Sequence, residues 1–329
     1  MEFRTTVKTG MEGVGILPED ELTLLGSCFA VHIGRRMEEA GLDTHVNPFG
    51  VLYNPLSIAA WCRAMVSEEP LSADCFFEDR GLWHCWLTDS SFSADTREAC
   101  VGKVESVRRM EAERVRTLSV LFITLGTNRF YRLCGNGRVV GNCHKQPASM
   151  FAEEQMDVEQ TVAVFEEVLE ALWHINPSLK IVFTVSPYRY AKYGYHESQL
   201  GKAVLLLSVD RLCHAHKKHC FYFPAYEIVL DELRDYRFYA ADMLHPSDVA
   251  VEYIWERLSE VCFTDETRGF MVEWEAVSRA LSHRPRHPES AAYREFLRQT
   301  MLKMDLLTEK YPKLAYSTVY DRLKSLLKY

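Results

Sequence analysis

The sequence lacks the features that direct a protein into or across a membrane. No stretch of its 329 residues approaches the ~20 consecutive apolar residues of a transmembrane helix, and residues 1–15 contain no apolar segment of a signal peptide. It also lacks internal repeats and low-complexity tracts. We therefore expect a cytoplasmic, globular protein without a membrane span.

An excess of positive charge is also missing. The net charge is −8, which disfavours nucleic-acid phosphates as the main partner. The ten cysteines are scattered without a short secreted disulfide framework, so we expect most of them to be small buried hydrophobic residues in a reducing compartment. The composition, 47% hydrophobic and 26% charged, is that of a globular protein with a sizeable core.

Apolar runs of strand length alternate with helical patterns over most of the chain. Strands are expected at 21–25, 44–46, 119–125, 180–185 and 220–223. Helices are expected between them, at 27–40, 57–65, 95–116, 157–174 and 199–219. The alternation predicts an α/β fold, a three-layer sandwich built on a parallel sheet.

Two segments interrupt this alternation, and the C-terminal part departs from it. An aromatic-rich stretch at about 70–96 is predicted to be a hairpin insertion, and 130–140 a second hairpin. Trp83 and Trp86 of the first fit a lid, a contact between copies in a homo-oligomer, or plain packing. A linker is expected at 284–288 and two basic helices at 290–304 and 317–328. The predicted units are an α/β domain at 1–265 and a helical appendage at 266–329.

Three short segments follow apolar runs and carry reactive side chains. They are Gly26-Ser27-Cys28-Phe29-Ala30, Gly126-Thr127-Asn128 and Asp242-Met243-Leu244-His245. Ligands of open α/β sheets bind at the carboxyl ends of strands, where we expect these segments to meet. Together they supply a hydroxyl or thiol nucleophile, an amide for an oxyanion, and a histidine with a carboxylate for its Nδ1, as nucleophilic acyl transfer requires.

Each segment also has an ordinary structural explanation. Ser27 can cap a helix while Cys28 packs, Asn128 suits a turn, and the residues after His245 can begin a helix. The three segments in this order favour the catalytic interpretation over the separate structural ones.

Two further clusters carry metal-binding or nucleophilic residue types. In the tract 213–220, His216 would share a helix face with His219 and Cys220, but the absence of a second ligand pair leads us to expect no metal site. The segment Asn142-Cys143-His144-Lys145 is expected to be a substrate-binding loop through Asn142, His144 and Lys145.

The three segments, together with Asn47-Pro48-Phe49-Gly50, resemble the GSCFA family, which belongs with the SGNH (GDSL-type) hydrolase-like proteins. The likeness covers about residues 20–260 and implies a flavodoxin-like sheet and an esterase-type site. In this pattern the nucleophile falls on Cys28 without a gap, and on Ser27 with a shift of one residue. Asp242 and His245 match its Asp-x-x-His element.

The resemblance also implies an oxyanion hole. Asn128 matches the asparagine of a Gly-x-Asn element, although Arg129 replaces the usual aspartate, and Gly50 is the candidate for a glycine N–H donor. The gap-free register favours Cys28 over Ser27, and a thiolate beside His245 would need little activation.

The resulting hypothesis is hydrolysis or transfer of an O-acyl group on a small-molecule ester. Resemblance suggests a small, acetyl-like group on a hydroxylated substrate such as a carbohydrate. The chemistry requires no metal or organic cofactor. The alternatives are an acyltransferase that uses Cys28, a non-catalytic ligand-binding protein with the same fold, and an interaction role through the C-terminal helices.

Overall fold

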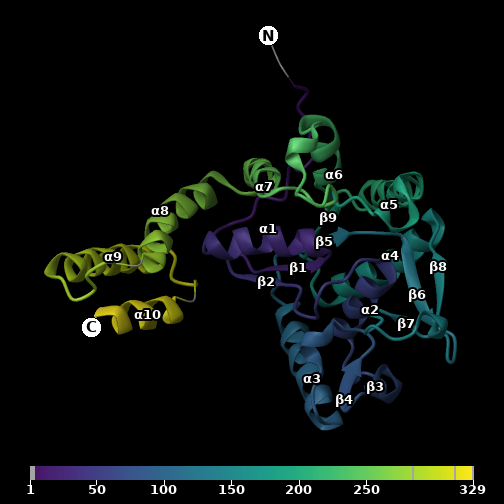
Figure 1. Ribbon diagram of the computed structural model, residues 1–329. Helices are drawn as coiled ribbons and strands as arrows, with labels where there is room; N and C mark the ends of the chain where they lie inside the picture. The colour runs from purple at the N-terminus through teal and green to yellow at the C-terminus, as the bar shows by residue number, and fades with distance from the viewer. Residues whose placement is uncertain (1–3, 284, 315, 328–329) are drawn as a thin grey trace.

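A five-stranded parallel sheet forms the centre of the protein, in a computed structural model that describes residues 4–283, 285–314 and 316–327 (Figure 1). The strand order is β2-β1-β5-β9-β10. The strands are β1 (Leu22–Gly26), β2 (Thr44–Val46), β5 (Val120–Leu125), β9 (Lys180–Val185) and β10 (Cys220–Tyr222). This is the flavodoxin-like order, in which the winding reverses between β1 and β5. The predicted parallel α/β fold is confirmed.

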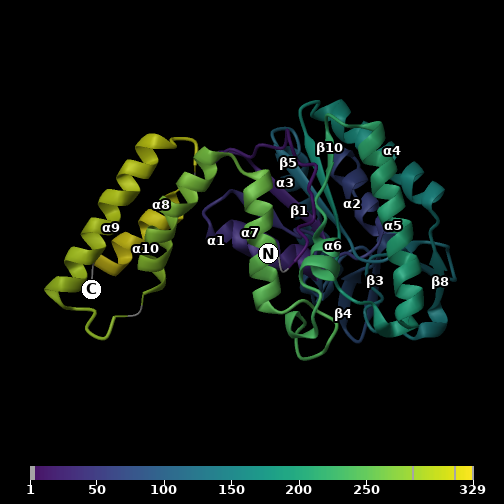
Figure 2. The same ribbon diagram turned by 90° about the horizontal axis from the view of Figure 1, so that it is seen from above.

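Helices cover both faces of the sheet (Figure 2). One face packs on α1 (Cys28–Glu39) and α7 (Asp248–Cys262), the other on α2 (Pro55–Val66), α3 (Arg97–Arg114), α4 (Val158–Ile175) and α5 (Tyr195–Ala215). Side chains of a strand alternate between faces, so Leu24 lies in the first core and Leu25 in the second. The result is the predicted three-layer arrangement.

The helix starts follow from capping residues in the sequence. Thr96 accepts a hydrogen bond from the Ala99 N–H at the start of α3, as predicted. Asp157 and Gln160 form a capping box at the start of α4.

Two antiparallel units are inserted into the sandwich. A hairpin of β3 (Phe76–Asp79) and β4 (Leu82–Cys85) lies within the range predicted for a hairpin insertion. A second sheet joins β6 (Arg129–Leu133), β7 (Val139–Val140) and β8 (Phe151–Gln155), of which the sequence did not predict β8. Trp86 is buried and stacks on Phe77 with ring centres 3.6 Å apart, so this tryptophan packs inside the insertion.

The C-terminal part consists of α8 (Asp265–Ser282), α9 (Ala291–Lys310) and α10 (Ser317–Leu327). We predicted the last two helices but not α8; residue 284 of the expected linker and residue 328 of the last helix lie outside the described residues. Trp274 of α8 joins this part to the end of α1, where its Nε1 donates to the Glu39 carbonyl at 3.1 Å. A short helix, α6 (Ala225–Glu227), follows β10. Among the described helices, none is long and apolar enough to cross a membrane.

Candidate active site

Gly26 makes the turn from β1 into α1. Its φ is +142°, and a Cβ atom here would lie 2.2 Å from the Thr124 carbonyl oxygen of the neighbouring strand. Its N–H donates to Oδ1 of Asn47 at 2.8 Å. Only glycine fits this close approach, which places the next two residues at the helix start.

Ser27 and Cys28 differ in what their side chains do at this helix start. Ser27 is 1% exposed, and its Oγ caps α1 by accepting the Phe29 N–H at 3.3 Å. Cys28 is the first residue of α1 and is partly exposed. The Ser27 hydroxyl is therefore engaged in capping the helix, whereas the Cys28 residue is partly open to solvent.

Several groups act on the thiol of Cys28. Burial has the largest effect and raises the pKa of the thiol, and the Asp242 carboxylate also raises it. The backbone N–H groups of Phe29 and Cys28 lower this pKa, and so does Lys202. The net result is a pKa above the ordinary value of a thiol. The thiol is therefore protonated at neutral pH and needs a base to become a nucleophile.

Asp242 and His245 form a hydrogen-bonded pair. Oδ2 of Asp242 lies 2.5 Å from Nδ1 of His245, and its Oδ1 accepts the N–H groups of Leu244 and His245 at 2.9 and 3.0 Å. The hydrogen bond from His245 lowers the pKa of Asp242 to about 2, so the carboxylate stays charged. With Nδ1 donating to it, Nε2 is left as the acceptor of a proton.

Backbone hydrogen bonds join the loops that carry these residues. They run from Ser27 N–H to the Thr124 carbonyl (3.3 Å), from Ser186 N–H to the Leu125 carbonyl (2.8 Å) and from Arg189 N–H to the Leu244 carbonyl (3.0 Å). These bonds link four segments, each to the next, at the carboxyl edge of the sheet: the loop after β1, the end of β5, the loop after β9 and the Asp242–His245 loop.

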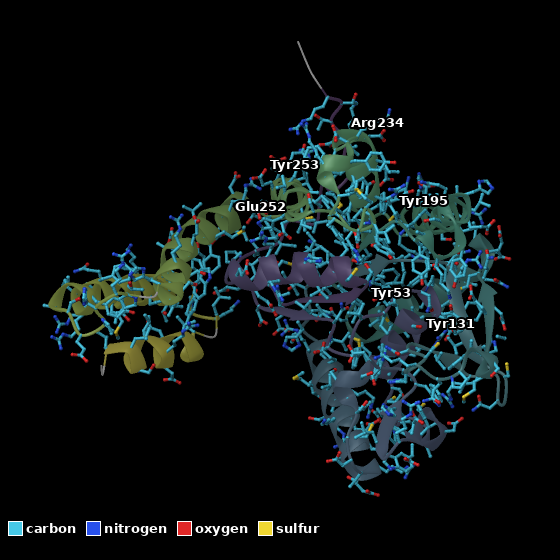
Figure 3. All side chains as sticks on the ribbon, viewed as in Figure 1. Tyr53, Tyr131, Tyr195, Arg234, Glu252 and Tyr253 are labelled. Atoms are coloured by element: carbon cyan, nitrogen blue, oxygen red, sulfur yellow. The ribbon has the colours of Figure 1, made fainter. Side chains whose placement is uncertain are left out.

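Two tyrosines line the same place, and the sequence analysis missed both. The Tyr188 ring lies 4.4 Å from the His245 ring, and its pKa is raised by burial and then by the charges of Asp242 and Cys28. The pKa of Tyr53, which is labelled in Figure 3, is likewise raised by burial and then by Cys28, and the residue is 41% exposed. Both tyrosines adjoin turn residues, and this position is the signal that could have found them. Tyr53 comes directly before Asn54-Pro55, and Tyr188 directly after Ser186-Pro187.

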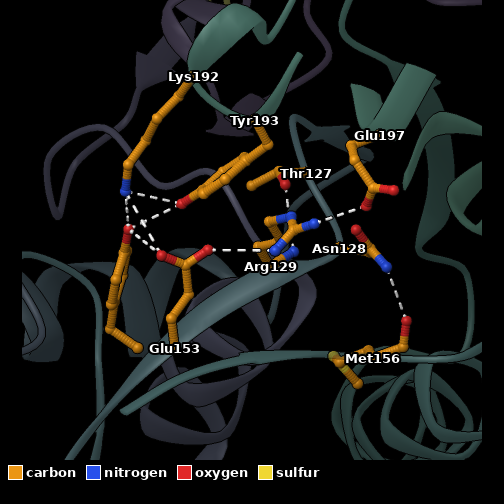
Figure 4. A network of polar contacts seen from close by, with 9 residues as sticks. Thr127, Asn128, Arg129, Glu153, Met156, Lys192, Tyr193 and Glu197 are labelled. Atoms are coloured by element: carbon orange, nitrogen blue, oxygen red, sulfur yellow. Dashed lines mark hydrogen bonds and ion pairs between the residues drawn. The ribbon is translucent and has the colours of Figure 1, made fainter. Parts of the chain in front are cut away.

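Asn128 is buried, and its side-chain amide already makes one hydrogen bond within the protein. Its Nδ2 donates one hydrogen to the Met156 carbonyl at 2.9 Å (Figure 4). A Cβ atom on Gly201 of α5 would lie 2.7 Å from Oδ1 of Asn128, so the two elements touch here. An amide nitrogen has two hydrogens, and one is left after the bond to Met156.

A charged network beside Asn128 ties the second sheet to α5. The Arg129 guanidinium bonds Glu153 of β8 at 3.3 Å and Glu197 of α5 at 2.8 Å (Figure 4). Lys192 donates to the Tyr193 hydroxyl at 2.7 Å and pairs with Glu153 at 3.4 Å. Arg129, which stands where the family pattern has an acidic residue, is therefore a structural cation of this network.

Gly50 is not available as an oxyanion donor. Its single N–H donates to the Asn47 carbonyl at 2.8 Å, which closes a turn. Its φ of +88° and the Asp89 carboxylate, 2.6 Å from where its Cβ would lie, explain why glycine is present. The prediction of an oxyanion role for the Gly50 amide is therefore wrong for this conformation.

The predicted substrate-binding loop packs on the first hairpin. His144 is buried, its Nε2 lies 2.8 Å from the Cys85 carbonyl, and burial lowers its pKa. Oδ1 of Asn142 accepts the His144 N–H at 2.8 Å, and Lys145 is exposed. His144 and Oδ1 of Asn142 thus hold the loop in shape, and Lys145 is the most exposed of the three residues.

The histidine-rich tract is not a helix face. Helix α5 ends at Ala215, so His216 and His219 lie beyond it and Cys220 begins β10. Nε2 of His216 pairs with Glu166 at 2.7 Å. In the part of the chain that the structure describes, no three His, Cys, Asp or Glu residues are grouped to hold a metal ion.

Two family models match the chain. Residues 21–258 match the model of the GSCFA family. The chain belongs to the GSCFA family. Residues 274–329 match the C-terminal domain of GSCFA domain proteins, and this second match spans most of α8 and all of α9 and α10. A search of curated proteins found no match to this GSCFA chain.

Proposed function

We propose that the protein is an SGNH-like acyl-ester hydrolase in which Cys28 is the nucleophile, His245 the general acid–base and Asp242 the residue that orients His245. The observation that carries the proposal is the hydrogen-bonded Asp242–His245 pair, with Oδ2 and Nδ1 2.5 Å apart, whose carboxylate is near enough to Cys28 to raise the pKa of its thiol. Cys28 is favoured over Ser27 because the Ser27 hydroxyl is buried as the cap of α1.

The reaction proceeds in two steps. Nε2 of His245 takes the thiol proton, and the sulfur adds to the ester carbonyl carbon. The tetrahedral intermediate then breaks its bond to the alcohol oxygen, which leaves with the proton from His245, and the acyl group stays on Cys28 as a thioester. His245 then deprotonates a water molecule, which attacks the thioester carbonyl carbon. The carbon–sulfur bond breaks, the acid is released, and His245 returns the proton to the sulfur.

The oxyanion is held by N–H groups at the start of α1 and by Asn128. The first residue of a helix has an N–H without an intrahelical partner and lies at the positive end of the helix dipole, which suits the Cys28 amide for this role. The remaining Nδ2 hydrogen of Asn128 is the second donor.

The substrate is an ester of a hydroxylated, carbohydrate-like molecule with a small acyl group. Tyr53 and Tyr188 support this choice, because a tyrosine offers an apolar face for a sugar ring and a hydroxyl for hydrogen bonds. Exposed Lys145 is a further candidate contact.

The test is a panel of p-nitrophenyl esters with acyl groups of two to eight carbons. Cys28→Ala and His245→Ala are expected to abolish turnover, and Ser27→Ala to keep most of it while losing about 1 kcal/mol of stability with the cap. Cys134→Ala, which removes an exposed thiol elsewhere, is the matched control and keeps full turnover.

Other outcomes overturn parts of the proposal. Turnover that survives in Cys28→Ala but not in Ser27→Ala makes the serine the nucleophile. Faster release of p-nitrophenol with an added sugar alcohol, together with the acylated alcohol as product, indicates an acyltransferase. A folded wild-type protein without turnover on any ester indicates a binding protein.

A further inference from the structure

Arg189 places a guanidinium group beside the Asp242–His245 loop. Its backbone N–H donates to the Leu244 carbonyl at 3.0 Å, and its Nη1 atom donates to the Met243 carbonyl, also at 3.0 Å. These two carbonyls belong to the residues that directly precede His245 in the chain. The positive charge of Arg189 is therefore attached to the segment that carries the proposed base.

The guanidinium group of Arg189 has most of its hydrogen-bond donors unused. A guanidinium group carries five N–H groups, and among the described residues the Met243 carbonyl is the one acceptor for those of Arg189. No carboxylate in residues 4–283, 285–314 and 316–327 forms an ion pair with it. The oxygens of Asp242 instead accept from His245 and from backbone N–H groups of their own loop. Arg189 is partly exposed, so its free donors can bind an anion that arrives from solution.

Three tyrosine rings surround this guanidinium group. Their centres lie 4.2 Å (Tyr195), 5.3 Å (Tyr239) and 5.7 Å (Tyr236) from its Cζ atom. Cation–π attraction to the rings helps to hold the arginine side chain in place. Tyr195 and Tyr236 are 51% and 65% exposed, so these rings border the guanidinium group without burying it. The donors are thus held in position and remain accessible, as a binding site requires.

The charges around Arg189 favour a ligand with one negative charge. Arg237, in the turn that carries two of the three tyrosines, lies 3.9 Å from Asp235, and Lys192, in the same loop as Arg189, lies 3.4 Å from Glu153. Of these three cationic side chains, Arg189 is the one without a carboxylate partner. A single uncompensated charge matches a carboxylate better than a doubly charged phosphate. A carboxylate also accepts two parallel hydrogen bonds from the planar fork of a guanidinium group.

We propose that Arg189, bordered by Tyr195, Tyr236 and Tyr239, binds a carboxylate on the alcohol part of the substrate, so that the protein acts on esters of acidic, sugar-like molecules. The tyrosines offer apolar ring faces to a sugar, and the carboxylate is assigned to the alcohol part because the proposed acyl group is small. The inference deepens the proposed function and rests on it for the ester chemistry. Its test measures binding without an ester, so a failure of hydrolysis and a failure of this site give different results.

The experiment titrates the full chain with three compounds that share one sugar ring and differ at carbon 6. D-Glucuronate carries a carboxylate there, D-glucose a hydroxymethyl group, and D-glucose 6-phosphate a phosphate ester. With ¹³C-labelled histidine, the signal of the His245 ring reports binding, and its loss in His245→Ala identifies it. We expect glucuronate to bind at least about tenfold more tightly than glucose. Equal binding of these two overturns the proposal, and tightest binding of the phosphate overturns the choice of a carboxylate.

Arg189→Gln removes the charge and is expected to reduce the binding of glucuronate to the level of glucose. Arg189 also holds the loop, and a loosened loop would weaken the binding of both sugars alike, so the ratio of the two affinities reports the charge. Arg237→Gln is the matched control, because it removes a neighbouring arginine whose side chain is 74% exposed and lies near Asp235. This control keeps the wild-type ratio. A wild-type ratio in folded Arg189→Gln overturns the proposal.

A second measurement uses the wild-type protein and covers the case in which Arg189→Gln fails to fold. Phenylglyoxal modifies accessible guanidinium groups, and mass spectrometry of peptides reads Arg189 and Arg237 separately. Glucuronate at about ten times its dissociation constant should slow the modification of Arg189 about tenfold, by mass action. Glucose at the same concentration should not slow it, and Arg237 should react at one rate throughout. An Arg189 rate that glucuronate does not change overturns the inference.

Discussion

Oδ2 of Asp242 lies 2.5 Å from Nδ1 of His245, while the other oxygen of the same carboxylate accepts the backbone N–H groups of Leu244 and His245. The aspartate thus holds the backbone of the loop, and it also keeps the proton of the neutral His245 ring on Nδ1 and not on Nε2. Asp242→Asn keeps the shape of the side chain and removes its negative charge. The His245 ring is then no longer held with its proton on Nδ1. We expect kcat for p-nitrophenyl acetate to fall by about 100-fold or more. A variant with unchanged kcat and native melting would show that the pair has no catalytic role.

The same pair predicts how stability changes in acid. The pKa of Asp242 is about 2 in the folded protein, below its ordinary value, because the carboxylate bonds His245. Its stabilising contribution is therefore complete above the unfolded pKa of about 4 and is lost as pH falls toward 2. The difference in urea midpoint between wild type and Asp242→Asn should shrink between pH 5 and pH 3. A constant difference over this range would contradict the assignment.

Gly26 should tolerate no side chain. Gly26→Ala places a Cβ atom 2.2 Å from the Thr124 carbonyl at a φ of +142°, and we expect a loss of about 3 kcal/mol or more in the free energy of unfolding. Gly81→Ala is the control, since Gly81 also has a positive φ, +81°, but no atom lies near its Cβ position, and it should cost about 1 kcal/mol. Urea denaturation measures both, and equal losses would refute the close-approach argument.

Arg189 is expected to hold the Asp242–His245 loop. Its Nη1 donates to the Met243 carbonyl at 3.0 Å, and its guanidinium lies 4.2 Å from the centre of the Tyr195 ring. Arg189→Ala should speed hydrogen exchange at the Leu244 and His245 amides and lower kcat several-fold without loss of the fold. The control is Arg237→Ala, because the Arg237 side chain is largely exposed. Unchanged exchange in Arg189→Ala would show that backbone bonds alone hold the loop.

The C-terminal helices are expected to contribute to stability and not to the proposed reaction. Trp274 covers Gly41 at the end of α1, and a helix of 12 residues is about 18 Å long, so this contact is far from Cys28 at the other end. Trp274→Ala should cost about 3 kcal/mol of stability and leave kcat/KM for p-nitrophenyl acetate within twofold. Exposed Val272→Ala is the neutral control. Loss of turnover in a folded Trp274→Ala protein would give these helices a part in the reaction.

The sequence predicted the helices and strands that are specified by residues within or next to the element itself. The central strands β1, β5 and β9 are continuous apolar runs between turn residues, and could be predicted directly. Helices α1, α3 and α4 start at capping side chains, which could be predicted in the same way. Strand β8 was missed because its residues are largely polar and only one neighbour, β6, pairs with it. For α8, the buried Phe270, Trp274 and Val277 recur at helical spacing, a signal that was present and overlooked.

For the site, the sequence predicted the Asp242–His245 contact but not what the other candidate groups contact. Asp242 and His245 could be paired because they are three residues apart. The commitment of the Gly50 N–H to a turn and of the His144 ring to the Cys85 carbonyl depends on tertiary contacts, which spacing does not encode. Lys202 could have been noticed as a lysine on the apolar face of a helix, although the two carbonyl groups that it bonds come from distant strand ends.

The linked loops at the sheet edge also determine when, during folding, the proposed catalytic residues come together. During synthesis the sulfur of Cys28 leaves the ribosome more than two hundred residues ahead of the imidazole of His245. The base reaches it only after the strands that carry the intervening loops have assembled. If Cys28 is the nucleophile as proposed, a nascent or prematurely ended chain therefore carries this thiol without its base, and the pair forms only when the fold is complete.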